Sequence, residues 1–573
     1  MPLVADFETT TDQNDCRVWA WGVTEIGNPG NFHYGNSLDG FIDFCKCSDN
    51  ATIYFHNEKF DGTFIMVWLF QHGFLHVIDR RDLDSNTFTT LISDKGQFYS
   101  MEIMFAKKNK ECVKVIIYDS LKILPFSVAE IAKGFNLPMK KGDIDYEKFR
   151  PIGHELDQEE LDYLQNDVVI IAMALHVLFA QGLNKMTAGS NALHDLKETI
   201  GNKNFEQWFP IPAYDHDVRQ SYKGGFTYLN PKYADVDIAA GIVLDVNSLY
   251  PWVMATKLLP YGEGIYFNGE YQQDDLYPLY ITMFRCNFEL KKNHIPTIQL
   301  KNNLSFVPTE YLTSSNGEDV ALCLTSVDYE LFKKHYNIYN IEFFSGWKFK
   351  AARGLLAPYI YKWYDIKTRS KLDGNKAMYT LSKLMQNSSY GKFALNPNVR
   401  SKIPYCENGV IKYVLGPKET RKPVYIPMGT FITAWARYTT ITAAQKNYKR
   451  FIYADTDSLH LQGTEIPASL GIDNTELGKW KWEYVFSKAR YLRQKSYIEY
   501  GREPLKEEQE KMQLIYNDLP EDMKITVAGL PERCYKYVTW ENFHPGISYP
   551  DKLQQKAVPG GIVLQKVAFS INK

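Results

Sequence analysis

Two acid-bearing segments that lie far apart in the chain constrain this fold more than any other feature. Ile242-Val-Leu-Asp245 and Phe451-Ile-Tyr-Ala-Asp455-Thr-Asp457 are strand-like apolar runs that end in carboxylates. Because side chains alternate along a strand, Asp455 and Asp457 are expected to share a face. Like charges so placed favour a cation such as Mg²⁺ between them. Alone, Asp-Thr-Asp-Ser is more typical of a solvated turn, but Asp245 at a second strand end favours a metal site.

A helix is predicted between these two strands. Met378 to Lys392 contains no proline, and its first glycine is Gly391, which we expect to stop the helix. Lys383, Asn387 and Tyr390 fall at i, i+4 and i+7 and therefore share one face. An ammonium group on such a face can bind a triphosphate as a point charge. Taken alone, this spacing is more typical of an ordinary amphipathic surface helix.

The first third of the chain carries a second set of acids. Asp6 and Glu8 are spaced for one face of a strand, and Asp61 precedes an apolar run that predicts a helix. Tyr163 and Asp167 fall at i and i+4 on a third element. Four carboxylates and a phenol suit two-metal hydrolysis of a phosphodiester. Each acid taken singly is more often a cap, a turn residue or a solvated group.

Composition agrees with a nucleic-acid enzyme of several domains. With 573 residues and 45% hydrophobic content, the chain can bury several cores, roughly three to five domains by length. The net charge of −2 is low for a nucleic-acid protein, so acidic sites must be offset by basic tracks such as Lys107-Lys108, Lys348 to Arg353 and Arg490 to Lys495. Each track taken alone is more typical of a solvated face. The 14% aromatic content suits base stacking, although most rings are expected in cores.

The cysteines and apolar runs indicate a soluble, unprocessed, intracellular protein. Eight cysteines are scattered, and the spacing of Cys45 and Cys47 is not that of a zinc site, so we expect reduced thiols. The longest apolar stretch, Val168 to Ala180, is shorter than the ~20 residues that span a bilayer. Asp6 and Glu8 stand where a signal peptide would need its apolar core.

These motifs together resemble a known family. Asp-x-x-Ser-Leu-Tyr-Pro, Lys-x-x-x-Asn-Ser-x-Tyr-Gly and Tyr-x-Asp-Thr-Asp-Ser resemble the three polymerase motifs of family B DNA polymerases. More narrowly, the chain is similar over its whole length to the protein-primed replicative polymerases of small Bacillus phages, including Tyr222-Lys-Gly-Gly-Phe226, Met428 to Arg437 and Leu492 to Tyr497. The acids of the first third resemble the proofreading 3′–5′ exonuclease of that family.

The resemblance implies an α/β and α+β multidomain fold, with a ribonuclease-H-like exonuclease beside a right-hand polymerase of palm, fingers and thumb. Two insertions, which mark the protein-primed subgroup, are expected: the first docks a terminal protein, and the second, a hairpin around Glu407-Asn-Gly409, supports strand displacement and processivity. Ordinary surface excursions are the alternative for both. The expected boundaries are exonuclease 1–187, palm 188–257 and 428–525, first insertion 258–354, fingers 355–394, second insertion 395–427 and thumb 526–573.

At the polymerase site, the resemblance implies that Asp245 and Asp457 chelate two Mg²⁺ ions, with Asp455 in support and Mn²⁺ as a candidate substitute. The backbone at Val246 is expected to contact metal and nucleotide. Tyr250 is expected to exclude ribonucleotides as the sugar gate. The remaining nucleotide contacts implied are Lys367, Lys383, Asn387 and Tyr390.

At the exonuclease site, the resemblance implies metal binding by Asp6, Glu8, Asp61 and Asp167. Tyr163 is expected to orient the attacking water, and Lys141 to assist at the scissile phosphate. The DNA contacts implied across both sites are Asn57, Phe60, Ser120, Leu121, Tyr222, Gly224, Gly225, Phe226, Lys392, Phe393, Arg437, Lys495 and Tyr497.

The resemblance implies a template-directed DNA polymerase that uses dNTPs, extends a primer or a terminal-protein hydroxyl, and works in the cytoplasm of an infected bacterium as a monomer or a heterodimer with the terminal protein. Tyr379 and Ser389 depart from the family pattern without removing a metal ligand. Three alternatives remain: a nuclease with an inactive polymerase half, a polymerase that needs an ordinary primer, and a non-enzymatic DNA-end scaffold.

Overall fold

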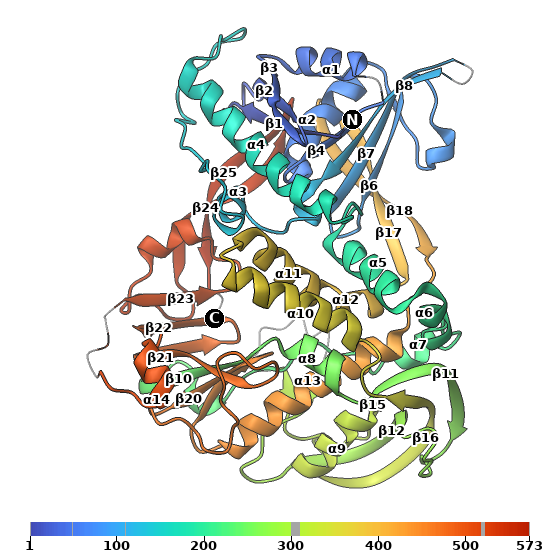
Figure 1. Cartoon of the computed structure of the whole chain (residues 1–573), viewed down its shortest axis with the longest axis vertical. Coiled ribbons are helices and arrows are strands. Elements are labelled where there is room, and N and C mark those ends of the chain that lie inside the picture. The colour runs from blue at the N-terminus through green and yellow to red at the C-terminus, as the bar shows by residue number, and fades with distance from the viewer. Residues whose placement is uncertain are drawn as a thin grey trace.

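The computed structural model describes residues 2–48, 50–108, 111–299, 310–516, 519 and 522–571. It contains three large sheets, each associated with a different part of the chain (Figure 1). The predicted first insertion (258–354), the palm (428–525) and the thumb (526–573) each include a few residues outside these ranges.

The N-terminal part is built on an eight-stranded mixed sheet of order β3-β2-β1-β4-β8-β7-β6-β5. The first strand carries both predicted acids, Asp6 and Glu8, which confirms the strand assignment. The strands are β1 Pro2–Thr9, β2 Val18–Glu25, β3 Asn28–Gly35, β4 Thr52–Phe55, β5 Leu75–His76, β6 Thr87–Ile92, β7 Phe98–Lys108 and β8 Glu111–Asp119. The helices are α1 Leu38–Cys47, α2 Glu58–Gln71, α3 Val128–Gly134 and α4 Gln158–Ala180, with short 3₁₀ turns η1 Arg80–Asp82 and η2 Ser120–Lys122.

Helix α4 packs against β1 and β2 and brings Tyr163 and Asp167 to the acids of β1. It begins with a capping box, because Asp157 accepts the amide of Glu160 while Glu160 accepts the amide of Asp157. By length and composition this is the one helix among the described residues that could cross a membrane, but 61% of its apolar window is buried inside the protein. Its apolar half therefore has the character of a core helix.

The second sheet has seven strands in the order β23-β22-β21-β10-β20-β19-β9 and brings the two predicted acidic strand ends together. β10 pairs with β20, so that Asp245 lies opposite Ser458. The strands are β9 Thr227–Leu229, β10 Asp237–Val246, β19 Phe451–Asp455, β20 Ser458–Gln462, β21 Trp480–Arg493, β22 Ser496–Arg502 and β23 Met523–Val527. The helices α5 Ala188–Ile200, α6 Asn202–Trp208, α7 Asp215–Arg219, α8 Leu249–Thr256 and α13 Ile426–Lys446 and the turn η3 Pro231–Tyr233 accompany it.

Two further units lie between β10 and β19 in the chain. A four-stranded sheet of order β11-β16-β12-β15 carries helix α9, and an antiparallel helix pair, α10 and α11, lies above the seven-stranded sheet in Figure 1. Their bounds are β11 Leu259–Asn268, β12 Leu279–Leu290, β13 Ile298–Gln299, β14 Tyr311–Leu312, β15 Val320–Thr325, α9 Ser326–His335, β16 Tyr336–Ala352, α10 Ala357–Leu372, α11 Lys376–Ser388 and α12 Tyr390–Phe393.

Two hairpins from distant parts of the chain meet beside α2. The first, β17 Asn398–Glu407 and β18 Val410–Thr420, turns at Asn408-Gly409, both at positive φ, as the sequence predicts. The second is β24 Ser548–Val558 and β25 Gly561–Ser570, preceded by α14 Lys506–Lys511 and η4 Glu532–Tyr537. The Gly560 amide donates to the Gly409 carbonyl at 3.1 Å. The two hairpin tips therefore contact each other.

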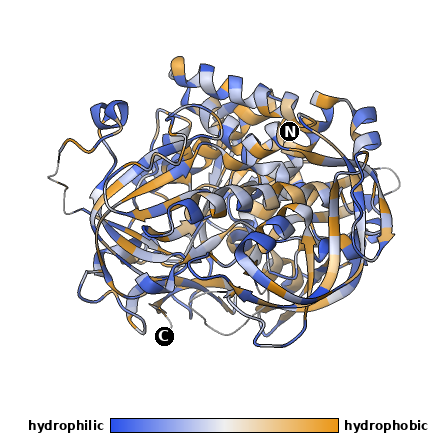
Figure 2. Ribbon diagram, turned by 90° about the horizontal axis from the view of Figure 1, so that it is seen from below, coloured by the Kyte–Doolittle hydropathy of each residue, from blue (hydrophilic) through white to orange (hydrophobic). Residues whose placement is uncertain are grey.

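Apolar side chains form several cores, as the composition predicts, and one of them is shared. A single hydrophobic cluster runs from Leu175 of α4 to Leu244 of β10 and Leu459 of β20. Figure 2 shows apolar residues along the inner helices and strands and hydrophilic residues on many of the outlying loops. The two large sheets therefore share buried apolar surface.

Candidate active sites

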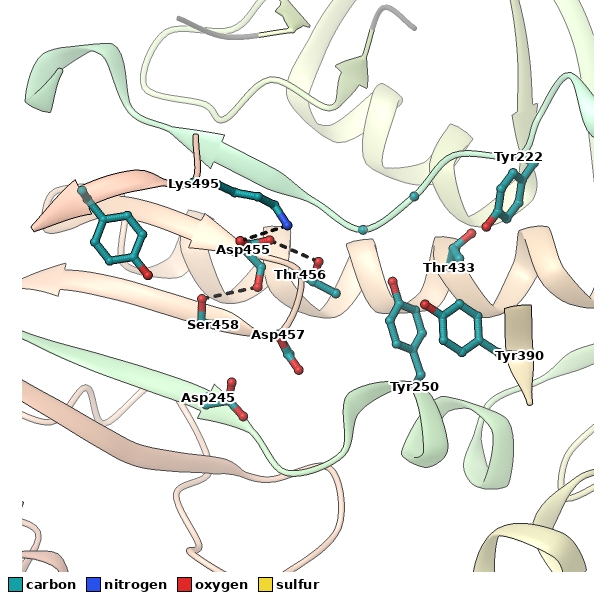
Figure 3. A pocket seen from close by; sticks show the side chains of 13 residues that line it. Tyr222, Asp245, Tyr250, Tyr390, Thr433, Asp455, Thr456, Asp457, Ser458 and Lys495 are labelled. Carbon is teal, nitrogen blue, oxygen red and sulfur yellow. Dashed lines mark hydrogen bonds and ion pairs between the residues drawn. The ribbon is translucent and has the colours of Figure 1, made fainter. Parts of the chain in front are cut away.

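A cavity of about 570 Å³ opens where β10, the β19–β20 turn, α8 and the β21–β22 turn meet (Figure 3). It is lined by Tyr222, Gly224, Gly225, Asp245, Tyr250, Tyr390, Thr433, Asp455, Thr456, Asp457, Ser458, Lys495 and Tyr497. These residues come from all three polymerase-like segments of the sequence.

Asp245 and Asp457 are neighbouring carboxylates in this cavity. Burial, and then the Asp457 and Glu483 carboxylates, raise the pKa of Asp245 to about 8, against the opposing pull of lysines. Burial is also the main cause that raises the pKa of Asp457 to about 6. The amide of Val246 donates to the Asp457 carbonyl at 2.9 Å, which ties the turn to β10. Such a pair is stable in ionised form only beside a positive charge.

The structure corrects the expectation that Asp455 and Asp457 share a strand face. β19 ends at Asp455, and Thr456 adopts a left-handed φ of 58°, so Asp457 lies in a turn. Asp457 points toward Asp245, whereas Asp455 points toward Lys495 (Figure 3). Thr227 donates to Asp455 at 3.0 Å, and the Lys495 ammonium lies 3.5 Å from it. Strand alternation therefore does not apply across this turn.

Two stacked tyrosines form the wall opposite the acids. The rings of Tyr250 and Tyr390 lie 4.1 Å apart at 16°. Burial raises the pKa of Tyr250 well above its usual range, so its hydroxyl is neutral. Ser248, at a φ of 53°, precedes α8, and its hydroxyl accepts from Lys367 at 3.4 Å. The site thus has flat apolar rings on one side and charges on the other.

The predicted middle helix is present, but it ends earlier than expected. α11 stops at Ser388, and Gly391 lies inside the short helix α12, so the expectation of a glycine stop was wrong. Lys383 and Asn387 are exposed on the face that Tyr390 continues. Lys383 is close enough to lower the pKa of Asp245, although other causes raise that pKa overall. Glycine marks the end of a helix when it adopts a left-handed conformation. Gly391 lies within helix α12 instead, so its position in the sequence does not mark the end of α11.

Gly225 is required by close packing beside the acids. A Cβ at this position would lie 2.4 Å from the Thr456 hydroxyl oxygen. Gly224, Gly225 and Tyr222 line the cavity. The loop from Tyr222 to Phe226 therefore packs directly on the turn that carries Asp457.

Four residues expected to contact DNA are buried and line neither cavity described here, whereas Tyr497 is buried but lines the first cavity. Phe226 and Phe393 are fully buried, and Phe393 packs on Phe205 and Phe209. The Ser120 hydroxyl is buried and donates to the Phe55 carbonyl.

Arg437, the fourth of them, is committed to protein groups. Its guanidinium donates to Asp328 and to the carbonyls of Lys223 and Gly224. These buried side chains position the loops around the site, and sequence spacing gave no sign of their burial. Lys392 is only partly buried and donates to Ser190.

A second cavity, of about 710 Å³, contains the predicted exonuclease residues. Asp6, Glu8, Asp61, Lys141, Tyr163 and Asp167 all line it, together with Asn57, Phe60, His56 and Tyr146. Leu553, Gln555, Val563 and Leu564 of the β24–β25 hairpin line it as well. Asp61 lies in the first turn of α2, which begins earlier than the predicted Thr63.

The acids of this cavity repel one another. Burial and the Asp167 charge raise the pKa of Asp6 to about 7, and burial with neighbouring carboxylates raises the pKa values of Glu8 and Asp61 well above normal. Burial also raises the pKa of Asp167, although Lys141 opposes this at 2.9 Å. One oxygen each of Asp61 and Asp167 is buried with no hydrogen-bond partner. Buried orphan carboxylate oxygens are the groups that a divalent cation would satisfy.

Sequence reasoning missed Tyr146 and His56. The hydroxyls of Tyr146 and Tyr163 lie 2.7 Å apart, and burial is the main cause that raises both phenol pKa values. His56 contacts the Ser120 hydroxyl at 3.0 Å. Asp119 accepts the amides of Asn57 and Leu121, each at 3.0 Å, and so fixes the two segments expected to bind a single strand. Tyr146 follows Lys141 closely in sequence, which was the available signal.

Both acidic clusters suit a hard divalent cation. Within the ranges that the structure describes, no three Asp, Glu, His or Cys side chains converge on one point. Magnesium is commonly held by one or two carboxylates together with water and substrate phosphates. The pair Asp245 and Asp457 and the orphan oxygens of Asp61 and Asp167 fit that mode of binding.

Comparison with known proteins gives a consistent result. Residues 44–153 and 143–472 match the family model "DNA polymerase type B, organellar and viral". The chain is 49% identical to the DNA polymerase of Bacillus phage phi29 over 573 residues, covering 99% of this chain and 98% of that protein. It is 31% identical to the DNA polymerase of Streptococcus phage Cp-1, with the same coverage.

A solved structure is similar over the whole chain. The phi29 DNA polymerase complexed with primer-template DNA and incoming nucleotides superposes with a TM-score of 0.93 at 47% identity and covers 100% of both chains.

Proposed function

The chain belongs to the organellar and viral type B DNA polymerases and is a template-directed DNA polymerase, and we propose that its two acidic cavities perform synthesis and 3′–5′ proofreading respectively. The observation that carries this proposal is the convergence of Asp245 and Asp457 opposite the Tyr250–Tyr390 stack. Template-primer DNA and dNTPs are the substrates.

Polymerases of this family use divalent metal ions, and we propose Mg²⁺ for both cavities, with two ions each. Bound there, the ions would activate the attacking oxygen and stabilise the leaving one. Asp245 and Asp457 would hold them in the polymerase cavity, with the backbone of Val246. Asp6, Glu8, Asp61 and Asp167 would hold them in the exonuclease cavity.

In the polymerase cavity, the protein's own groups orient the substrates. Lys383 of α11 and Lys367 of α10 provide positive charge for the triphosphate. Asn387 lies on the same face of α11 as Lys383. The flat wall of Tyr250 and Tyr390 would support the sugar and base. The Tyr250 ring would exclude a 2′-hydroxyl. Lys495, held by Asp455, is placed to contact the primer strand.

In the exonuclease cavity, the paired hydroxyls of Tyr163 and Tyr146 orient the attacking water. Lys141 stabilises charge at the scissile phosphate while it is held by Asp167. Asn57 and Phe60, which line this cavity, would contact a single strand. Ser120 and Leu121 are the further contacts that the resemblance implies.

We propose the domain roles that the resemblance implies. The eight-stranded unit is the exonuclease, the seven-stranded sheet the palm, α10 and α11 the fingers, and the β24–β25 hairpin the thumb. The four-stranded sheet with α9 would dock a terminal protein whose hydroxyl starts synthesis. The contact between the tips of the β17–β18 and β24–β25 hairpins would enclose DNA and support strand displacement. We propose that the enzyme works in the cytoplasm of the infected host.

The test is extension of a labelled primer on a circular single-stranded template with Mg²⁺, dNTPs and no other protein. Products many times longer than the circle are expected, since strand displacement would let synthesis continue past the primer. No extension, combined with loss of 3′ nucleotides in the absence of dNTPs, would instead indicate a nuclease with a silent polymerase half.

A further inference from the structure

Beyond the polymerase cavity, three polar side chains are buried together inside the seven-stranded sheet. His460 is 1% exposed, and Tyr491 and Glu499 are fully buried. The Tyr491 hydroxyl donates to Glu499 Oε1 at 2.6 Å, and His460 Nδ1 lies 2.9 Å from the same oxygen. His460 Nδ1 also lies 2.8 Å from the Tyr491 hydroxyl. The three groups form a closed hydrogen-bonded triangle.

The triangle joins the two turns that shape the cavity. His460 is on β20, which begins immediately after Asp457. Tyr491 is on β21 and Glu499 on β22, at equal distances on either side of Lys495 in the sequence. The triangle therefore links the strand behind the metal-binding turn to both arms of the hairpin that presents Lys495.

Aromatic rings fill the space between the triangle and the cavity. Tyr497 lies 4.9 Å from Tyr491, nearly parallel to it, and 5.3 Å from His460. Tyr453 packs on His460 at 5.1 Å and on Tyr497 at 5.3 Å. Both rings are therefore held by members of the triangle.

Tyr453 then reaches the hairpin turn. Its hydroxyl accepts the Lys495 amide at 3.1 Å and donates to Asp455 Oδ2 at 3.3 Å. Lys495 has a φ of 56°, a left-handed conformation that a non-glycine residue keeps only when its surroundings impose it. The Ala528 amide donates to the Lys495 carbonyl and holds the other side.

A buried carboxylate is an expensive way to fill a sheet interior. Burial by itself raises the pKa of Glu499, but the interactions with His460, the Lys524 charge and the hydrogen bond from Tyr491 outweigh it and leave the pKa lowered. Apolar side chains of similar volume would avoid that desolvation cost. What the polar triangle provides in exchange is direction, because hydrogen bonds fix orientation more tightly than apolar contacts do.

We propose that Glu499, with His460 and Tyr491, is a positioning device that holds the Lys495–Tyr497 turn, and through it the primer terminus, over Asp455 and Asp457. The inference rests on the proposed polymerase function and deepens it. None of the three residues touches substrate. Their role is to keep Lys495 and Tyr497 in place while the terminus is extended instead of released.

The test compares Glu499→Gln with Glu508→Gln. Glu508 is also a fully buried carboxylate, but it pairs with Arg502 at the opposite end of β22 from Lys495. Three quantities are measured: the dissociation constant for primer-template, the KM for dNTP, and the dNTP concentration at which extension balances 3′ degradation. Thermal stability and single-strand degradation are measured in parallel.

For Glu499→Gln we expect primer-template binding to weaken and the balancing dNTP concentration to rise, each roughly tenfold, with the dNTP KM and single-strand degradation within about twofold of wild type. Glu508→Gln should lose comparable stability and leave both quantities unchanged. Tyr491→Phe, which removes one hydroxyl and keeps the ring, should shift them in the same direction by a smaller factor, and it serves if Glu499→Gln fails to fold.

Equal behaviour of the Glu499 and Glu508 variants, or an unshifted Tyr491→Phe, would reduce the triangle to a structural element and overturn the inference. Primer extension by the wild-type protein under the same conditions separates the proposed polymerase function from the proposed positioning role of the triangle. Its absence would overturn the polymerase proposal itself.

Discussion

Asp245 is a half-buried carboxylate beside another carboxylate, and its stability cost follows from that position. Its pKa is raised from 3.8 to about 8, so the metal-free folded protein holds a proton that the unfolded chain releases. Stability is therefore lost as the pH rises from about 4, and the loss is complete above about 8.

We accordingly expect Asp245→Asn to stabilise the metal-free protein while abolishing synthesis. In EDTA the variant should have a larger free energy of unfolding than wild type, by a difference that grows between pH 4 and pH 8 and reaches on the order of 5 kcal/mol. Calorimetry at a series of pH values measures this. A difference that did not depend on pH would mean that Asp245 is not strained by its neighbours.

Tyr250 offers a second test at residue scale. The Tyr250 ring stacks on Tyr390, so Tyr250→Val should remove the ring and open space for a 2′-hydroxyl. We expect the preference for deoxynucleotides over ribonucleotides to fall roughly 10- to 100-fold. Single-nucleotide insertion kinetics measure it. Tyr390→Phe keeps the ring and should leave the preference unchanged; a similar drop in both variants would remove Tyr250 from the role of sugar gate.

Single residues also show how far the sequence reached. The acids of both cavities were predicted because metal chemistry requires carboxylates, and the spacing of these carboxylates can be recognised in the sequence alone. The burial of Arg437 and Phe393 was not predicted, because their partners Asp328 and Phe205 are distant in the chain. The turn at Thr456 reversed the expected facing of Asp455, since a single left-handed residue breaks strand alternation.

At the scale of elements, we propose that the contact between the two hairpin tips encloses the DNA path. Gly560 has a φ of 92°, and a Cβ there would lie 2.4 Å from the Cys16 carbonyl oxygen. The Gly560 amide is the group that donates to Gly409 of the other hairpin. A larger side chain must therefore shift the tip and break that contact.

We expect Gly560→Val to shorten the products made per binding event severalfold while the rate of adding one nucleotide stays within about twofold. Extension in the presence of a trap DNA measures processivity, and single-turnover insertion measures the chemistry. Gly182→Val is the matched control: Gly182 also has positive φ, but no atom lies within 4 Å of its would-be Cβ. Equal processivity in the two variants would show that the contact between the hairpin tips does not contribute to processivity.

The element-level predictions succeeded where local chemistry decides the structure. Asn408-Gly409 forms the expected hairpin turn because both residues tolerate positive φ. The end of α11 was misplaced because Gly391 takes an ordinary helical conformation in α12. The contact between the two hairpin tips could not be inferred, because pairing between such distant segments depends on the whole fold.

At the scale of the whole molecule, the two cavities are chemically separate but structurally joined. The exonuclease cavity draws part of its lining from Leu553 and Leu564 of the C-terminal hairpin, and the shared apolar cluster links α4 to β10 and β20. We propose that a primer end that leaves the polymerase cavity reaches the exonuclease cavity along surfaces of this chain. Neither set of acids, however, contributes a residue to the other cavity.

This separation predicts reciprocal losses. Asp457→Ala should reduce synthesis on the order of 10³-fold or more and leave single-strand degradation near wild type, because its carboxylate serves only the palm cavity. Asp6→Ala combined with Asp61→Ala should remove 3′ degradation to the same extent and preserve extension. Both activities are measured on one labelled oligonucleotide, with and without its template and dNTPs. Loss of both activities in either variant would show that the cavities depend on a common metal or a common fold transition. Persistent degradation in the double variant would show that the nuclease site lies elsewhere in the chain.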